Sequence, residues 1–173
     1  RAVKIMIDVC RAVEHAHNNG VIHGDIKPGN VLVPASEKES ARITDFGLSK
    51  VFDAQNNANL QISRSLNFAE SASEIVGTLR YLAPEVQRGE KVDSLADIYS
   101  IGVLLFEVLT GGLPEGREVP SDVKKGIPGS LDDLFCRCFV RKNRRMKTVA
   151  EIIAELECIL ESKGFSIAEK ANR

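Results

Sequence analysis

Apolar side chains recur every three or four residues over residues 1–19, which predicts an amphipathic helix. The residues that share its apolar face are Ala2, Ile5, Met6, Val9, Val13 and Ala16. Gly20 follows at the position where a left-handed residue ends many helices. Three more helices are predicted over residues 92–110, 130–140 and 148–163. The first of these is apolar on nearly all sides, so we expect it to be buried.

Polar residues and glycines mark where the later helices begin and end. The candidate N-terminal caps are Asp93 or Ser94, Ser130 with Asp133 in a capping box, and Thr148 with Glu151 in a second box. The glycine pair 111–112 is predicted to end the second helix, and Gly164 the last. Ile152, Leu156, Ile159 and Leu160 are expected to form the buried stripe of the last helix.

Two short β-branched runs, residues 31–33 and 42–44, predict small strands joined by a polar turn. Residues 53–73 are rich in Asn, Gln and Ser without a clear period, and they predict a surface loop. The predicted fold class is therefore mainly α with short β-hairpins. The polar tail from residue 165 is expected to fray.

Composition excludes several classes of function. The chain has 173 residues, 43% apolar and 27% charged, with a formal net charge of −1, so no overall basic field suggests nucleic acid or an anionic membrane as partner. The longest apolar stretch, residues 101–109, contains Glu107 and is too short to span a bilayer. Four dispersed cysteines predict reduced, mostly buried thiols in a cytoplasmic protein.

The candidate chemistry lies on either side of the predicted hairpin. The loop before it reads HGDIKPGN, residues 23–30, and the segment after it reads DFG, residues 45–47. A hairpin would bring Asp25, Lys27, Asn30 and Asp45 close together. Carboxylate and amide oxygens suit Mg²⁺, a second carboxylate can accept a hydroxyl proton, and a lysine can offset charge on a phosphoryl group. The set therefore predicts phosphoryl transfer.

These motifs resemble those of the protein kinase family, in its C-terminal lobe. HGDIKPGN corresponds to the His-Arg-Asp loop with Asn five residues after the Asp, DFG to the second motif, and APE at residues 83–85 to the third. GTLRYL at 77–82 and DIYSIG at 97–102 also match family segments. The resemblance implies a helical bundle around a buried central helix over residues 1–164, with 165–173 as a tail. It also implies that the small lobe that covers ATP lies outside this sequence.

The resemblance assigns roles within a Ser/Thr protein kinase that uses ATP and Mg²⁺ on a protein substrate. Asp25 would deprotonate the substrate hydroxyl, Lys27 would contact the transferred phosphate, and Thr78 would brace both. Asn30 and Asp45 would hold magnesium, and Leu32 would pack under the adenine ring.

Other residues are expected to be structural. The resemblance implies that His23 and Phe46 stack in the core, anchored by Asp97. His15 and His17 are interpreted as ordinary surface residues near a helix end. The basic run is interpreted as a solvated face and consists of Arg137, Arg141, Lys142, Arg144, Arg145 and Lys147.

The sequence departs from the family pattern at two places. Gly24 replaces the arginine that normally meets an activation-segment phosphate, which predicts less control by phosphorylation. The family's arginine partner of Glu85 is replaced by Met146, and we predict that Arg144 or Arg145 reaches Glu85 instead.

Two alternatives remain open from the sequence. One is a pseudokinase, a binding or scaffold module on the same fold, and the other is a small helical interaction domain. Because no Gly-rich phosphate loop and no strand lysine occurs in these 173 residues, we expect them alone to have little kinase activity.

Overall fold

The structure is a computed structural model that describes residues 1–36, 38–46, 77 and 79–171. Its helices and strands are α1 (Ala2–Asn18), the 3-10 helix η1 (Pro28–Asn30), β1 (Val31–Leu32), β2 (Arg42–Ile43), α5 (Pro84–Gln87), α6 (Ser94–Thr110), α7 (Pro120–Val123), α8 (Gly129–Cys138), the 3-10 helix η2 (Lys142–Arg144) and α9 (Val149–Ala171). The predicted class, mainly α with a short hairpin, is confirmed. Each strand is one residue shorter than predicted, and the predicted surface loop lies outside the described residues.

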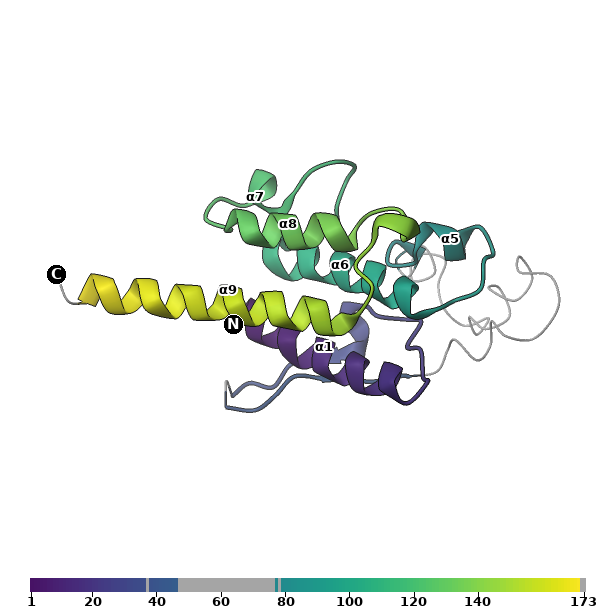
Figure 1. The fold of residues 1–173 in the computed structure, drawn as a ribbon, viewed down its shortest axis with the longest axis horizontal. Coiled ribbons are helices and arrows are strands. Elements are labelled where there is room, and N and C mark those ends of the chain that lie inside the picture. Colours follow the sequence, from purple (N-terminus) through teal and green to yellow (C-terminus); the bar gives the residue numbers. More distant parts are fainter. Residues whose placement is uncertain (37, 47–76, 78, 172–173) are drawn as a thin grey trace.

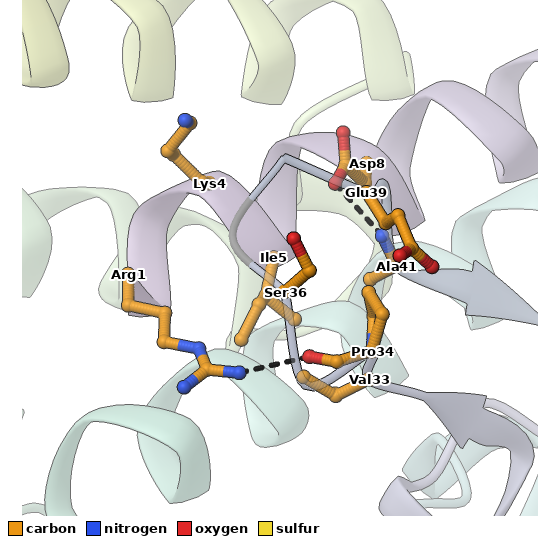
Figure 2. Close-up of a pocket in the computed structure, with 9 residues that line it drawn as sticks. All are labelled: Arg1, Lys4, Ile5, Asp8, Val33, Pro34, Ser36, Glu39 and Ala41. Atoms are coloured by element: carbon orange, nitrogen blue, oxygen red, sulfur yellow. Dashed lines mark hydrogen bonds between the residues drawn. The ribbon is translucent and has the colours of Figure 1, made fainter.

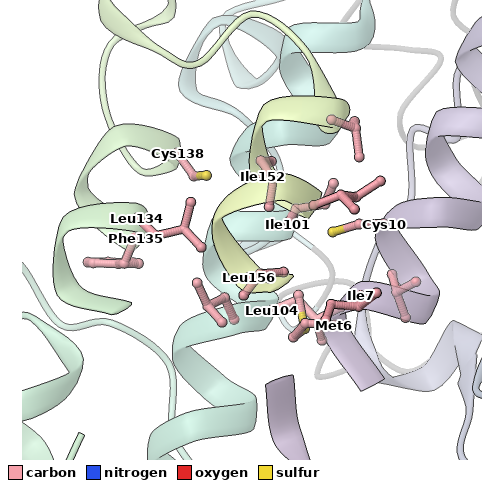
Figure 3. Close-up of a cluster of buried hydrophobic side chains, with 14 of the residues drawn as sticks. Met6, Ile7, Cys10, Ile101, Leu104, Leu134, Phe135, Cys138, Ile152 and Leu156 are labelled. Carbon is pink, nitrogen blue, oxygen red and sulfur yellow. The ribbon is translucent and has the colours of Figure 1, made fainter. Parts of the chain in front are cut away.

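Helix α6 is the buried centre of the fold, as its apolar sequence predicts. It contacts α1 on one side and α8 on the other, while α9 lies along α1 (Figure 1). Four helices contribute to the shared core, including Met6 and Cys10 from α1, Ile101 and Leu104 from α6, Leu134 and Cys138 from α8, and Ile152 and Leu156 from α9 (Figure 3). This core supports the loop that leaves α1 and the hairpin that follows it.

Helices α6 and α8 approach each other closely at Gly102. A Cβ atom at this position would lie 2.8 Å from Cβ of Cys138 and 3.3 Å from the backbone nitrogen of Phe139. Real carbon atoms do not pack at 2.8 Å, so the absence of a side chain at Gly102 sets the distance between the two helices.

The predicted caps form at four helix ends. Asp93 caps α6 by accepting hydrogen bonds from the backbone N–H groups of Leu95 and Ala96, at 3.0 and 3.3 Å. Gly20 after α1 and Gly111 after α6 have φ of 72° and 91°, the left-handed conformation that glycine adopts without steric cost. The Thr148–Glu151 box is also present at the start of α9.

Two predicted helix ends are wrong. Helix α8 begins at Gly129 behind Pro128, so Ser130 lies within its first turn and cannot serve as the cap. Helix α9 continues through Gly164 to Ala171. A glycine inside a helix costs only about 1 kcal/mol relative to alanine, and strong helix formers follow it at 168–171. The predicted fraying tail is therefore helical as far as Ala171.

Two predictions about burial are corrected. All four cysteines are free, as expected, but only Cys10 and Cys138 are buried, whereas Cys136 and Cys158 are exposed on the outer faces of α8 and α9. Leu160 is 38% exposed and does not belong to the buried stripe of α9.

Candidate active site

The loop after α1 is fixed by one buried carboxylate on α6. Asp97 is only 1% exposed, and its Oδ2 accepts a hydrogen bond from the backbone N–H of His23 at 2.9 Å. Its Oδ1 accepts another from the N–H of Gly24 at 2.8 Å. Gly24 has a φ of 77°, which glycine adopts more easily than any residue with a side chain. The predicted anchoring by Asp97 is therefore confirmed, and it sets the direction in which the chain enters Asp25.

His17 is the third partner of Asp97, which corrects its interpretation as a surface residue. Its Nε2 lies 2.7 Å from Oδ2 of Asp97, and its side chain is 14% exposed. A buried carboxylate needs hydrogen-bond donors to offset the loss of water, and the last turn of α1 supplies one. His15, on the same helix, is exposed as expected.

Asp25, Lys27 and Asn30 meet in one cluster, as the sequence predicts. Oδ2 of Asp25 lies 2.9 Å from Nζ of Lys27 and accepts a hydrogen bond from Nδ2 of Asn30 at 2.9 Å. The same Nδ2 also donates to the backbone oxygen of Asp25 at 2.7 Å. Asp25 and Asn30 are each only 7% exposed, so the cluster is held within the fold.

The hydrogen bonds determine which end of the Asn30 amide faces Asp25 and which end is left for another ligand. The amide nitrogen has two partners, the backbone oxygen of Asp25 and a carboxylate oxygen of the same residue. Both oxygens can accept a hydrogen bond but cannot donate one. The nitrogen must therefore face Asp25, and the amide oxygen Oδ1 faces away from it. No donor in the described ranges contacts this oxygen, or Oδ1 of Asp25. Two oxygens are thus left for groups from outside the cluster.

The antiparallel hairpin places Asp45 one residue after Thr44, which pairs with the backbone of Asn30. Val31 of β1 pairs with Ile43 of β2, which places Asn30 opposite Thr44. The Thr44 N–H donates to the backbone oxygen of Asn30 at 2.9 Å, and Asp45 follows directly. Oγ1 of Thr44 lies 3.1 Å from Oδ2 of Asp45. The three predicted residues of the first loop and Asp45 are therefore connected through Thr44.

Asp45 has a φ of 61°, the sole left-handed residue other than glycine in the described part of the chain. This conformation costs a residue with a side chain about 1–2 kcal/mol, although Asp tolerates it better than most. The Asp45 side chain is exposed, so this strained residue keeps its carboxylate accessible from outside the fold.

Arg1, directly before α1, and Asp8, in the second turn of α1, hold the far end of the hairpin. Nη2 of Arg1 donates to the backbone oxygen of Pro34 at 2.9 Å, and Oδ2 of Asp8 accepts from the N–H of Ala41 at 3.0 Å (Figure 2). These two bonds lie on either side of a small cavity. They brace the connection between β1 and β2.

Three other residues have roles assigned from the sequence, namely Leu32, Phe46 and Thr78. Leu32 lies on β1 and is 57% exposed, a large apolar side chain without cover in this structure. The rings of Phe46 and His23 are in contact, with centroids 4.5 Å apart, but Phe46 is 41% exposed and not part of the core. Thr78 lies outside the described residues.

His23 is buried and acts as a structural residue. Burial lowers the pKa of its imidazole, against the opposing effect of the nearby Asp97 and Asp25 carboxylates. Its Nδ1 accepts a hydrogen bond from the Asp25 N–H at 3.3 Å, whereas its Nε2 has no partner among the residues that the structure describes. A neutral ring that accepts from the backbone helps to orient Asp25.

A buried ion pair joins α5 to the segment before α9, as predicted for Glu85. Nη1 and Nη2 of Arg145 donate to the two carboxylate oxygens of Glu85 at 2.5 and 3.1 Å. The same guanidinium donates to the backbone oxygens of Leu95 and Val140 at 2.6 and 3.0 Å, and it lies over the ring of Tyr99. Of the two candidates, Arg145 is the partner.

The basic run over residues 137–147 is therefore not one solvated face. Arg145 is 1% exposed, Lys142 pairs with Asp93 at 2.8 Å, and Arg137 pairs with Glu155. Arg145 had to be buried because Glu85, itself buried, requires a cation.

Neither a metal cluster nor a membrane span is found in what the structure describes. No group of three or more His, Cys, Asp or Glu side chains there is placed to hold a metal ion. The oxygen set near the hairpin is smaller, two carboxylates and one amide, which suits Mg²⁺ held together with substrate phosphates. No helix within the same residues is long and apolar enough to cross a membrane.

Comparison with known proteins identifies similar sequences. The family described as "Protein kinase domain" matches residues 1–163. The chain is 31% identical over 172 residues to the serine/threonine-protein kinase PknB of Mycobacterium tuberculosis, covering 90% of this chain and 26% of that protein. It is 31% identical to a probable serine/threonine-protein kinase of Clostridium perfringens, covering 98% of this chain and 25% of that protein. The PknB of Mycolicibacterium smegmatis is 30% identical, with 95% and 27% covered. The chain thus spans about a quarter of the length of these relatives.

Proposed function

Because this chain belongs to the protein kinase domain family, we propose that the protein transfers the γ-phosphoryl group of ATP to a serine or threonine hydroxyl of a protein substrate. The observation that carries the proposal is the cluster of Asp25, Lys27 and Asn30, joined to Asp45 through the hairpin. The three relatives, two named as serine/threonine-protein kinases and one as a probable one, support the same reaction class.

Asp25 is the proposed base. Lys27 and Asn30 both contact its Oδ2, which leaves Oδ1 to accept the proton of an approaching hydroxyl. Two donors on one oxygen also fix the plane of the carboxylate, so the free oxygen keeps one direction. Positioning of this kind, together with electrostatic stabilisation, accounts for most of the catalysis in phosphoryl transfer.

Lys27 and Thr78 are proposed to act beside the base. The side chain of Lys27 is 26% exposed, so its ammonium group can approach a phosphoryl group while it stays within reach of Asp25. Its positive charge would offset the negative charge on the oxygens of the group in transfer. Thr78 would brace Asp25 and Lys27.

Asn30 and Asp45 are the proposed magnesium ligands, through the amide oxygen that faces away from Asp25 and through the exposed carboxylate. Bound Mg²⁺ would neutralise charge on the ATP phosphates. The exposed side chain of Leu32, on the strand next to Asn30, would give the adenine ring an apolar surface.

We further propose that residues 1–164 act as the C-terminal lobe of the kinase, that a nucleotide-covering lobe comes from outside these 173 residues, and that they alone transfer little phosphate. The protein is proposed to work in the cytoplasm, without nucleic acid as partner. Gly24 provides no guanidinium for an activation-segment phosphate, and the loop is held by Asp97 instead. Phosphorylation of that segment should therefore have less control over the geometry of the site than it has in a kinase with the arginine.

The proposal is tested by phosphate transfer from ATP to a generic basic protein substrate, with the full-length protein and its Asp25→Asn variant. We expect D25N to lose at least about 100-fold in rate while it retains ATP binding, because general-base catalysis contributes about 10²- to 10⁴-fold. K142M is a matched control that changes a lysine outside the cluster and should keep the wild-type rate. Binding of ATP without transfer by the wild type would favour a pseudokinase, and binding of neither ATP nor Mg²⁺ would favour an interaction domain.

A further inference from the structure

The hydroxyl of Thr44 lies between the two proposed magnesium ligands. Oγ1 is 3.3 Å from the backbone oxygen of Asn30 and 3.1 Å from Oδ2 of Asp45. A hydroxyl has one proton to donate, so only one of these oxygens receives it at a time. The carboxylate is closer and charged, and the Asn30 oxygen already accepts the Thr44 N–H at 2.9 Å. The proton therefore goes to Asp45.

Asp45 has few other restraints. Its side chain is exposed, its backbone is left-handed, and the Thr44 hydroxyl is the sole hydrogen-bond partner of its carboxylate in the described ranges. Without that bond, the carboxylate would rotate among several orientations. It would then lose more side-chain freedom whenever it binds a cation.

We propose that Thr44 is a positioning residue, whose hydroxyl orients the Asp45 carboxylate for a divalent cation. The inference rests on the proposed function, because it takes Asp45 as a ligand of that cation. One lone pair of Oδ2 is taken up by Thr44, whereas Oδ1 stays open. The methyl group of Thr44 contributes nothing to this bond, so serine should replace threonine and valine should not.

The test is Mn²⁺ binding to the full-length protein in the presence of ATP, followed by electron paramagnetic resonance of the free ion. Thr44→Val keeps the shape of the side chain and removes the hydroxyl, and we expect it to weaken Mn²⁺ binding about three- to tenfold. Thr44→Ser should restore affinity to within about twofold of wild type, a rescue that a purely structural role of the β-branched side chain would not give.

Two control variants distinguish a failure of the role proposed for Thr44 from a failure of the proposed function. Thr110→Val removes a hydroxyl that bonds to the Phe106 backbone oxygen at the end of α6, and it should leave Mn²⁺ affinity unchanged. Asp45→Asn should weaken binding more than T44V does. If the wild type binds Mn²⁺ and D45N does not, but T44V equals wild type or binds more tightly, the role of Thr44 is refuted and the proposed function stands. If D45N equals wild type, both fail. Should T44V not fold, T44A against T44S makes the same comparison.

Discussion

Arg145 is the residue whose replacement should have the largest effect on stability. Arg145→Met fills the position with an apolar side chain of similar length and removes the guanidinium. Glu85, with a side chain only 3% exposed, would then be a buried carboxylate without a cation. The backbone oxygens of Leu95 and Val140 would also lose a donor.

The expected cost follows from that burial. Removing one partner of a buried ion pair costs about 3–5 kcal/mol, because the other charge stays out of water. Since about 1.4 kcal/mol corresponds to a factor of ten, the local unfolding equilibrium should rise by about two to four powers of ten. Surface pairs are worth much less, and Arg144, which is exposed next to Arg145, provides the comparison.

The assay is amide hydrogen exchange of the full-length protein by mass spectrometry, read in peptides that cover α5 and the first turns of α6. R145M should increase the exchange rate there by about two to four powers of ten. The matched control R144M should change the free energy of opening by less than about 0.5 kcal/mol. Adding Glu85→Gln to R145M should recover a large part of the loss, because no buried charge then remains. Equal exchange in R145M and R144M would refute the assignment of a buried, stability-determining pair.

Three further changes test the packing, the loop anchor and the acid response. Gly102→Ala should destabilise the α6–α8 contact by about 1–3 kcal/mol, because the new carbon would meet Cβ of Cys138 at 2.8 Å, and thermal denaturation followed by circular dichroism measures this. His17→Ala should speed hydrogen exchange of the amides at 23 and 24 about tenfold, because Asp97 loses one of its three donors. Burial alone would raise the pKa of Glu85, but the hydrogen bonds and charge of Arg145 outweigh it and lower the pKa. Its stabilisation is therefore present above the unfolded-state pKa of about 4.3 and is lost as pH falls through the lower folded value, so Glu85→Gln should flatten the acid unfolding curve.

The first two of these changes have matched controls in the chain. Gly129→Ala places a Cβ where no atom lies within 4 Å, so it should not reproduce the loss seen at Gly102. His15→Ala removes an exposed imidazole from the same helix as His17, and exchange in the loop should not respond to it. If G129A destabilises the protein as much as G102A, the close contact at Gly102 is not the cause of the loss. If H15A speeds exchange as much as H17A, the bond from His17 to Asp97 is not what protects the loop. An acid transition identical in E85Q and wild type would contradict the role given to the carboxylate.

Much of the fold is predictable because local signals determine it. Asp93 caps α6 and Gly111 ends it, as the sequence predicts, because both follow from which backbone groups a helix end leaves unpaired. The partner of Glu85 was limited to two adjacent arginines, because a buried carboxylate needs a nearby cation. The choice between Arg144 and Arg145 depends on three-dimensional direction, which sequence spacing does not provide.

One error concerns a contact that has no local signal, and two concern local signals that compete with each other. His17 has the sequence context of a surface residue, and its bond to Asp97 joins positions 80 apart in the chain. The start of α8 at Gly129 depends on Pro128, which directs the chain into the helix one residue before the predicted cap. The helix beyond Gly164 shows that helix-forming residues downstream can outweigh a single glycine.

The most direct test of the central claim is the position of a bound cation. Anomalous diffraction from crystals of the full-length protein with Mn²⁺ and a non-hydrolysable ATP analogue locates the metal without reference to activity. We predict a peak about 2 Å from Oδ1 of Asn30 and from a carboxylate oxygen of Asp45, with Oδ1 of Asp25 facing the terminal phosphate. A metal and nucleotide bound elsewhere, with Asn30 and Asp45 contacting neither, would contradict the account.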